Sequence, residues 1–345
     1  MQSRRTFLTR ASASVLAAKA LVQTAMAQQP RPIKVGFLGT AHSHFKGKLA
    51  VVEESAEWQL AGLCEENEAI RAHGPRDANW LSANELFAKS EVIVVESAVQ
   101  DHARDAKRAL LAGKHVYVEK PPAETLKGLR ELLSLAKERR RIFQIGYMWR
   151  YNPGINAVLD AARRGWLGEV YLVRATMNTL VGPEQRRDWA RFQGGAMFEQ
   201  GCHLIDPLVR LLGKPSRVDP FLKRTSADGL ADNCVAVFGF PNALGIVTSA
   251  PLQPNAGPQR FFEVLGTNGT ARVQPLEPPA LTVDLGKAAG PYSAGRQEVK
   301  LPGYRRYVDE FVALASAIRQ GTPLPVTSAV ELMIQEALLR ACKMK

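Results

Sequence analysis

The segment HVYVEKPP at residues 115–122 is the most informative stretch of this chain. A short run of β-branched and aromatic residues, typical of a buried strand, ends abruptly at Glu119, Lys120 and Pro121. Pro121 has no N–H group, so the chain must leave the strand directly after Lys120. A lysine at the carboxyl end of a buried strand is costly unless it has a use, and ligands bind at this edge of open α/β sheets. A lysine in a surface turn is the alternative, and this segment alone does not decide between them.

Strand and helix patterns alternate on both sides of this segment. The continuous apolar run at 92–96 is typical of a strand in a sheet that is covered on both faces. Alternation of strands and helices at this spacing predicts βαβ units and a parallel sheet. We expect its strands at 33–39, 58–64, 92–96, 115–118 and 142–146, with helices at 103–112 and 123–140 among the segments between them.

The pattern changes after Asn152-Pro153-Gly154. A helix at 155–164 is followed by strand-like runs separated by turn residues, which predicts a second, α+β domain with an antiparallel sheet. The Gly- and Pro-rich piece at 286–303 is expected to be an exposed loop. The strand-like runs lie at 169–178, 233–240, 243–250, 260–266 and 269–274, and two helices at 304–320 and 328–342 finish the chain.

The first 27 residues have the features of an export signal. Arg4 and Arg5 form a twin-arginine pattern, a weakly apolar alanine-rich stretch follows, and Ala25-Met26-Ala27 is a small-x-small cleavage site before Gln28. The stretch is short for a bilayer span and contains Lys19. We therefore expect a bacterial protein that the twin-arginine export machinery carries, already folded, to the periplasm.

Composition narrows the class of protein. The chain has 345 residues and a formal net charge of +12. Residues 1–27 hold four basic residues and no acid, so the remainder has a charge of +8. Without an arginine-rich block among aromatics, nucleic acid is a poor candidate ligand. The four cysteines form no C-x-x-C pair, which gives zinc and thioredoxin-type chemistry little support; a periplasm permits disulfides, but buried thiols are the default expectation.

A glycine turn follows the first expected strand. Gly36 and Gly39 precede Thr40, and a G-x-G-x-x-G turn here would bring backbone N–H groups to a pyrophosphate. Ala41 and His44 occupy the second and third glycine positions. We expect Glu65, which follows the second strand, to accept hydrogen bonds from an adenosine ribose, favouring NAD over NADP. His42 and His44 lack ligand-spaced partners in the sequence, so a metal site is not expected.

Five segments of the chain form a recognisable set. They are the glycine turn, AGKHVYVEKP (112–121), GYMWRYNP (146–153), GEV (168–170) and GGAMFEQGCH (194–203). Together they resemble the glucose-fructose oxidoreductase, inositol dehydrogenase and rhizopine-catabolism oxidoreductase family, and the resemblance covers nearly all of the chain after the export signal. It implies an NAD(P)-binding Rossmann domain at 28–150, and at 151–345 a domain with a large open antiparallel sheet that often forms the interface of a homodimer or homotetramer.

The resemblance also implies the residues of a catalytic site. In the family, the segment that matches 199–203 carries an aspartate and a histidine; this chain keeps His203 and has Glu199 in the aspartate position. If this segment is an α-helix, Glu199, His203 and Asp206 share one face. An imidazole beside two carboxylates suits acid–base chemistry, although a structural histidine is the alternative. Glu119, Lys120 and Pro121 are assigned to the cofactor site. The substrate site is assigned to Arg150, Tyr151, Asp188, Trp189 and Asp206.

Three functions follow as alternatives. The first is hydride transfer between a sugar or polyol carbon and tightly bound NAD, with Lys120 and His203 handling the proton and Glu199 orienting His203 or binding a neighbouring hydroxyl. The second is a redox-neutral cycle in which transient oxidation allows a glycosidic group to leave, as in the glycosidase branch of this family. The third is a sugar-binding protein without cofactor, which the altered glycine turn and Glu199 favour, whereas Lys120 and His203 speak against it.

Overall fold

The computed structural model describes residues 31–345, and the export signal expected at 1–27 lies outside them. The first sheet has five parallel strands in the order β2-β1-β3-β4-β5. Its central strand, at 92–95, is fully buried, as the continuous apolar run there predicts. The strands are β1 (Ile33–Leu38), β2 (Trp58–Cys64), β3 (Val92–Val95), β4 (His115–Val118) and β5 (Phe143–Ile145).

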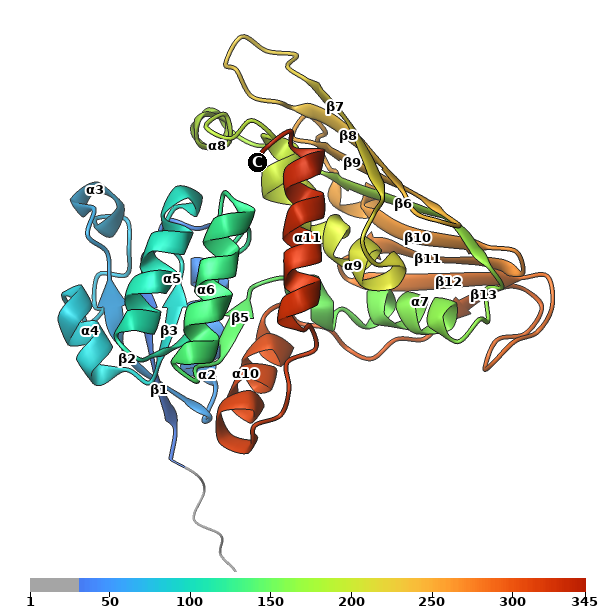
Figure 1. The fold of residues 1–345 in the computed structure, drawn as a ribbon. Helices are drawn as coiled ribbons and strands as arrows, with labels where there is room; N and C mark the ends of the chain where they lie inside the picture. Colours follow the sequence, from blue (N-terminus) through green and yellow to red (C-terminus); the bar gives the residue numbers. More distant parts are fainter. Residues whose placement is uncertain (1–30) are drawn as a thin grey trace, which may run out of the picture. The chain divides into compact units, whose positions relative to one another are not determined.

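Helices cover this sheet, and local sequence sets where they begin. Ser82 and Glu85 form a capping box at the start of α4, and Thr125 caps α6, which therefore begins three residues later than expected. The chain order reverses between β1 and β3, which creates the crevice where open α/β sheets bind ligands. The helices are α2 (Phe45–Glu54), α3 (Glu68–Arg71), α4 (Ala83–Lys89), η1 (Val99–Asp101), α5 (His102–Leu111), α6 (Leu126–Glu138) and η2 (Met148–Tyr151) (Figure 1).

The second sheet has eight strands in the order β13-β12-β11-β10-β6-β9-β8-β7. All neighbours are antiparallel except β6 and β9, so the sheet is mixed where an antiparallel one was expected. The long connection through α9 (Cys202–Leu212), β7 and β8 lets β9 return in the same direction as β6. The strands are β6 (Val170–Asn178), β7 (Arg217–Lys223), β8 (Asn233–Gly239), β9 (Leu244–Ala250), β10 (Phe261–Gly266), β11 (Gly269–Leu276), β12 (Pro279–Leu285) and β13 (Gly295–Val299).

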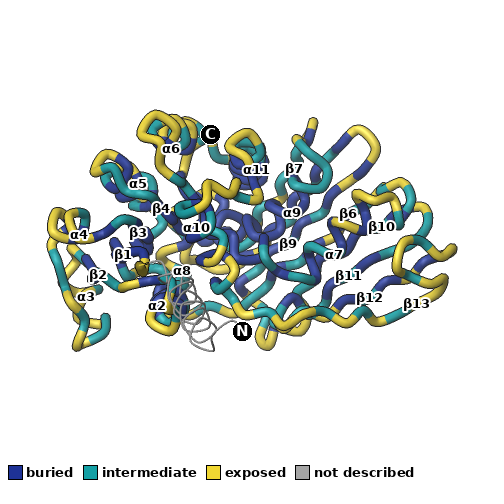
Figure 2. The backbone as a smooth tube through the Cα atoms, turned by 90° about the horizontal axis from the view of Figure 1, so that it is seen from below, coloured by how far each residue is buried: buried dark blue, intermediate teal, exposed yellow. Residues whose placement is uncertain are grey.

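Helices pack on one face of this sheet. Helix α7 lies against β10, β11 and β12, and α9 lies against β6 and β9. The opposite face keeps large apolar side chains exposed, among them Phe221 and Leu244. Figure 2 shows the alternation of buried and exposed residues along these strands. The helices are α7 (Pro153–Arg163), α8 (Pro183–Trp189), a π-helical turn η3 (Met197–Gly201), α9 (Cys202–Leu212) and η4 (Gly257–Gln259).

The two C-terminal helices connect the two sheets. Within α10 (Val308–Gln320), Glu310 accepts a hydrogen bond of 2.8 Å from the buried Tyr117 hydroxyl of β4. Within α11 (Ser328–Ala341), Gln335 donates one of 2.6 Å to the carbonyl of Ala123, just before α6, while the helix also packs on α9. These contacts tie β4 and the segment before α6 to the C-terminal helices, and Figure 1 shows α11 lying between α6 and α9.

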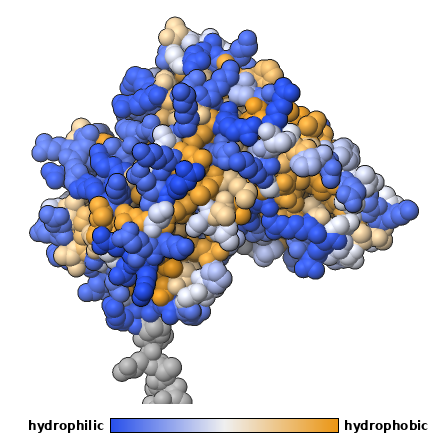
Figure 3. All heavy atoms as spheres, viewed as in Figure 1, coloured by the Kyte–Doolittle hydropathy of each residue, from blue (hydrophilic) through white to orange (hydrophobic). Residues whose placement is uncertain are grey.

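Three further features of the described residues are the character of the outer surface, the state of the cysteines and the apolar content of the helices. Hydrophilic side chains cover much of the face made by α4, α5 and α6, as amphipathic helices on a buried sheet require (Figure 3). All four cysteines are buried and free. Among residues 31–345, none of the helices combines the length and apolar character that crossing a membrane takes.

Candidate active site

A cleft runs along the carboxyl ends of the first sheet and beneath α8 of the second domain. It consists of a cavity of about 1050 Å³ and a smaller one of about 370 Å³. Both cavities are lined by Ala41, Asn67, Ile70, Ala98 and Gln100, so they adjoin at the glycine turn. This is the position expected of an extended ligand at the switch point of an open sheet.

Gly39 and Glu65 shape the glycine turn. Gly39 has φ +82°, and a Cβ atom there would meet the Ser97 backbone at 2.3 Å, so the turn requires glycine. Glu65 accepts a hydrogen bond of 2.8 Å from the backbone N–H of Thr40. Gly36 has a different role from the one expected, because it is buried in β1 against Leu86 and Ser90 and reaches neither cavity.

The smaller cavity has an acidic lining. Gly39, Ala41 and Glu65 lie in it, together with Glu66, Asp101, Arg104 and Asp105. Arg104 is already paired with Asp101 at 2.8 Å and with Asp105 at 2.9 Å. A ribose diol fits this lining because carboxylates accept hydrogen bonds from hydroxyls, whereas a 2′-phosphate would meet mainly negative charge.

The two histidines of the turn stand above a buried charge cluster. His44 Nδ1 lies 2.9 Å from Oε1 of Glu119. The fully buried Lys48 ammonium pairs with Glu96 at 2.7 Å and also contacts Glu119. Burial alone would raise the pKa of Glu119, but Lys48 and the two histidines hold it well below its usual range. Burial lowers the pKa of His44 to about 4, so its ring is neutral at pH 7.

His42, His44 and Glu119 bring one potential ligand atom each to within 4.8 Å of one another. That spacing would suit a metal ion, which the sequence did not lead us to expect. However, the Lys48 ammonium already neutralises Glu119, and a divalent cation would have to lie against it. We therefore interpret the cluster as a support that fixes the end of β4 beneath the turn.

Lys120 leaves β4 and crosses to the second domain. Its side chain is 4% exposed, and Nζ donates a hydrogen bond of 2.9 Å to the carbonyl of Glu199. Its backbone N–H is held by Glu119 at 2.8 Å, and the carbonyl of Pro121 lies 2.8 Å from Nδ1 of His102. The strand end is thus fixed on both sides, while the ammonium group lines the larger cavity.

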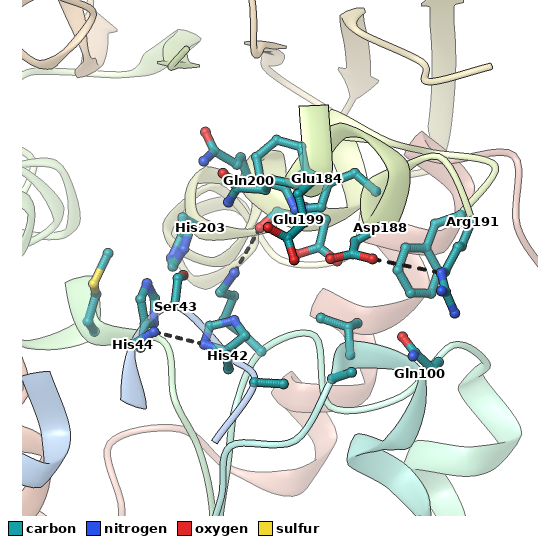
Figure 4. Close-up of a pocket in the computed structure, with 18 of the residues that line it drawn as sticks. His42, Ser43, His44, Gln100, Glu184, Asp188, Arg191, Glu199, Gln200 and His203 are labelled. Carbon is teal, nitrogen blue, oxygen red and sulfur yellow. Dashed lines mark hydrogen bonds and ion pairs between the residues drawn. The ribbon is translucent and has the colours of Figure 1, made fainter. Parts of the chain in front are cut away.

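Glu199 and His203 line the same cavity as Lys120 (Figure 4). Oε1 of Glu199 and Nδ1 of His203 are buried without a hydrogen-bond partner among the described residues, so the expected contact between these two side chains is not formed. The π-helical turn η3 changes the α-helical spacing on which that expectation rested. Burial raises the pKa of Glu199 to about 7, and burial followed by Lys120 lowers the pKa of His203 well below its usual value.

Arg150 and Asp206 lie away from the cavity, in contrast to the expectation for both. Arg150 is buried and pairs with Asp206 at 2.8 Å and with Glu331 of α11 at 2.6 Å. The side chain of Asp206 is therefore turned from His203 towards Arg150, and this network joins η2, α9 and α11. Tyr151 does not line the cavity either. A buried guanidinium needs such carboxylates, and the sequence does not show which residues supply them.

Asp188 and Trp189 of α8 do line the larger cavity, as expected of wall residues. Sequence reasoning missed Arg260, Arg306 and Tyr307, which line it from the far end of the chain. Arg260 directly precedes β10, and Arg306 and Tyr307 form the turn before α10, in segments without any recognisable motif. For Arg260, the signal available in the sequence was a basic residue at the start of a strand, which is only a weak indication of a binding residue.

Two family models match this chain. The model described as an oxidoreductase family with an NAD-binding Rossmann fold matches residues 33–147, and the model of the GFO/IDH/MocA C-terminal domain matches residues 155–272. The first range covers the parallel sheet, and the second covers the site segment around Glu199 and much of the second sheet. The chain belongs to the Gfo/Idh/MocA oxidoreductase family. The resemblance inferred from the sequence is thereby confirmed.

Curated relatives in this family are distant. An uncharacterised oxidoreductase of Schizosaccharomyces pombe is 29% identical over 198 residues, which cover 54% of this chain and 53% of that protein. A dTDP-3,4-didehydro-2,6-dideoxy-alpha-D-glucose 3-reductase of Streptomyces violaceoruber is 26% identical over 236 residues, 67% of each chain. This chain therefore spans about half of the length of the first relative and two thirds of the second.

A solved structure has the same fold. A protein of Desulfitobacterium hafniense, described as an NADPH-dependent oxidoreductase, superposes with a TM-score of 0.78. The match covers 90% of this chain and 95% of that chain at 20% identity. At this identity the likeness concerns the fold, a Rossmann domain followed by a domain with a large sheet.

Proposed function

We propose that this protein is an oxidoreductase that transfers hydride between a CH–OH carbon of a sugar or polyol and a nicotinamide cofactor. The observation that carries the proposal is the meeting of Lys120, Glu199 and His203, from two different domains, in one cavity that continues into the glycine turn. Family membership supports this reaction class. The name of the Streptomyces relative, a sugar reductase, supports the substrate class.

The cleft fits a dinucleotide. The smaller cavity, with Glu65 and the Gly39 turn, would hold the adenosine half, and His42, His44 and Lys120 border the space for the nicotinamide half. The bound cofactor supplies a site that accepts or returns hydride. The acidic lining around Glu65 favours NAD, although the Desulfitobacterium neighbour is described as NADPH-dependent.

The side chains of this protein handle the proton and the oxygen. His203 is neutral at pH 7 because burial lowers its pKa, so it can accept the hydroxyl proton of the substrate. Lys120 donates a hydrogen bond to the same oxygen and polarises the carbonyl in the reverse direction. Glu199 binds a neighbouring hydroxyl, and Trp189 offers an apolar face to the sugar ring.

The twin-arginine pattern at Arg4 and Arg5 supports export. A periplasm has no useful free pool of NAD(H), so a dissociating cofactor would leave the enzyme idle. We propose that the chain is exported folded with its cofactor tightly held. Such an enzyme either couples two sugar substrates or runs the redox-neutral cleavage cycle, since either restores the cofactor.

Product analysis distinguishes the candidate functions. The purified protein is supplied with NAD and mixed with sugars, polyols and glycosides, and products are identified by mass spectrometry while the absorbance of reduced nicotinamide is followed. Net oxidation or coupled oxidation and reduction would support the proposal. Cleaved glycoside without net redox change would favour the cleavage cycle. Sugar binding without any product, in a protein that takes up no nucleotide, would leave the binding-protein function.

A further inference from the structure

Arg260 stands out among the residues that line the larger cavity. It precedes β10, and its Nε donates a hydrogen bond of 2.7 Å to the main-chain carbonyl of Asn178 at the end of β6. Its two terminal nitrogens have neither a hydrogen bond nor an ion pair within residues 31–345. One edge of the guanidinium is therefore anchored to the protein, and the other edge is available to the cavity.

The anchor of Arg260 is itself fixed. The side chain of Asn178 accepts a hydrogen bond of 3.0 Å from the backbone N–H of Ala250 and donates one of 2.8 Å to Gln253. These bonds tie the carbonyl that holds Arg260 to the end of β9. A guanidinium held in this way loses little conformational entropy when it binds a ligand.

The other arginines of the cavity differ from Arg260 in their charge balance. Arg306 pairs with Glu277, and Arg191 is exposed with Asp188 at 4.0 Å. Partial burial, and then the nearby charge of Arg306, lower the pKa of Arg260. Among the described arginines that line this cavity, Arg260 is thus the one that is partly buried and has no carboxylate partner.

Acidic residues of the cavity do not cancel this charge. Glu184 and Asp188 are exposed on α8, where water and salt screen them. Glu199 is buried, but no hydrogen bond or ion pair joins it to Arg260, and its raised pKa keeps about half of it protonated near pH 7. A partly buried guanidinium with a free edge presents paired N–H donors to a carboxylate or phosphate.

We propose that Arg260 binds the anionic group of the substrate, and that the substrate is an acidic carbohydrate, a sugar acid or a sugar phosphate. This inference deepens the proposed function and rests on it for the reaction, but not for the binding. The anionic group would lie at the Arg260 wall, while a hydroxyl of the same molecule reaches Lys120 and His203.

Matched ligand pairs test the proposal by calorimetry on the NAD-loaded protein. The neutral parents are glucose, galactose and mannose. The anionic probes are their uronates (glucuronate, galacturonate and mannuronate) and their 6-phosphates. At least one anionic probe should bind about 10-fold or more tightly than its neutral parent. The class that binds more tightly, uronate or sugar phosphate, identifies the anionic group of the substrate. If no anionic probe binds more tightly than its parent, the proposal is overturned.

Two variants test whether Arg260, and not another arginine of the cavity, binds the anionic group. Arg260→Gln should abolish the preference for the anionic probe and leave the affinity for its neutral parent unchanged. Arg191→Gln, an exposed arginine of the same cavity, should keep the preference. An unchanged preference in Arg260→Gln would overturn the proposal, as would a loss of NAD affinity instead. Because NAD is titrated separately, a protein that binds the anion through Arg260 but takes up no NAD would refute the proposed function alone.

Discussion

The Lys120 ammonium group donates a hydrogen bond of 2.9 Å to the main-chain carbonyl of Glu199. This bond joins the end of a strand in the Rossmann sheet to the π-helical turn that precedes His203. It uses a backbone oxygen rather than the Glu199 carboxylate. Both side chains therefore keep polar atoms for a ligand, and the two domains contribute to one site.

Lys120 is the first residue to test. Lys120→Met should lower kcat/KM for the sugar substrate by about 10³-fold, since a positioned proton donor or acceptor contributes 10²–10⁴-fold. The thermal unfolding midpoint and the Kd for NAD should change little. Lys127→Met, which removes an exposed lysine from α6, is the matched control and should behave as wild type. Turnover at the wild-type rate in Lys120→Met would remove Lys120 from the mechanism.

Glu199 should make stability depend on pH. Burial raises its pKa from 4.5 to about 7 in the folded protein, so the folded state binds more protons than the unfolded state between these values. The protonated carboxyl group of Glu199 contributes stability that is fully present below the unfolded pKa of 4.5 and is lost as pH rises through about 7. Relative to wild type, Glu199→Gln should gain up to about 3 kcal/mol in unfolding free energy between about pH 5 and pH 8.

Urea unfolding at the two pH values measures this difference. Glu184→Gln, which changes an exposed carboxylate of the same cavity, should follow the wild-type pH dependence. A Glu199→Gln variant whose stability runs parallel to wild type over this range would show that the carboxyl group titrates normally.

Glu65 should set the preference for NAD. In Glu65→Gln the amide oxygen can still accept the Thr40 N–H, but the negative charge is gone. The Kd for NADP should fall by about 10-fold, equivalent to about 1.4 kcal/mol, while NAD binds slightly more weakly. Glu66→Gln is the control, since Glu66 lines the same cavity but is paired with Arg108 at 2.7 Å. A wild-type protein that prefers NADP would contradict this assignment.

Arg150 should matter for folding rather than for substrate binding. Arg150→Met leaves the buried Glu331 carboxylate without its partner and Asp206 with only the longer contact to Arg210 at 3.4 Å, and it should lower the unfolding free energy by about 3–5 kcal/mol. Adding Glu331→Gln should restore part of that loss. The KM of the folded variant should stay within about twofold of wild type. A stable variant with a raised KM would show that Arg150 takes part in substrate binding after all.

The Rossmann half of the fold could be predicted from sequence because its signals are local. Continuous apolar runs such as 92–95 and the break at Pro121 mark buried strands and their ends. The edge strands β7 and β13 were missed, because β7 contains Pro220 and β13 reads GRQEV, and neither alternates apolar and polar residues. Strand β13 lies within the segment expected to be a loop. Strand β12 was missed as well, although it carries an alternating pattern at Leu281, Val283 and Leu285.

The site could be predicted in part, for the same reason. Lys120 and His203 lie in motifs that are continuous in sequence. The π-helical turn at 197–201 has no signal in an α-helical spacing argument, so the relation of Glu199 to His203 could not be foreseen. The partners of Arg150 are 56 and 181 residues away in sequence. Such pairs depend on the tertiary fold, and the same holds for Arg260.

The most direct test of the central claim is a denaturing extraction of the purified protein, with mass and absorbance analysis of the released molecules. It is followed by calorimetric titration of the emptied protein with NAD and NADP. We predict about one NAD(H) released per chain, or one equivalent of NAD bound on titration, in wild type and in Lys120→Met alike. Release of no nucleotide, together with no uptake of NAD or NADP, would contradict the account. It would indicate that the glycine turn, with Ala41 and His44 in place of two glycines, no longer binds the cofactor.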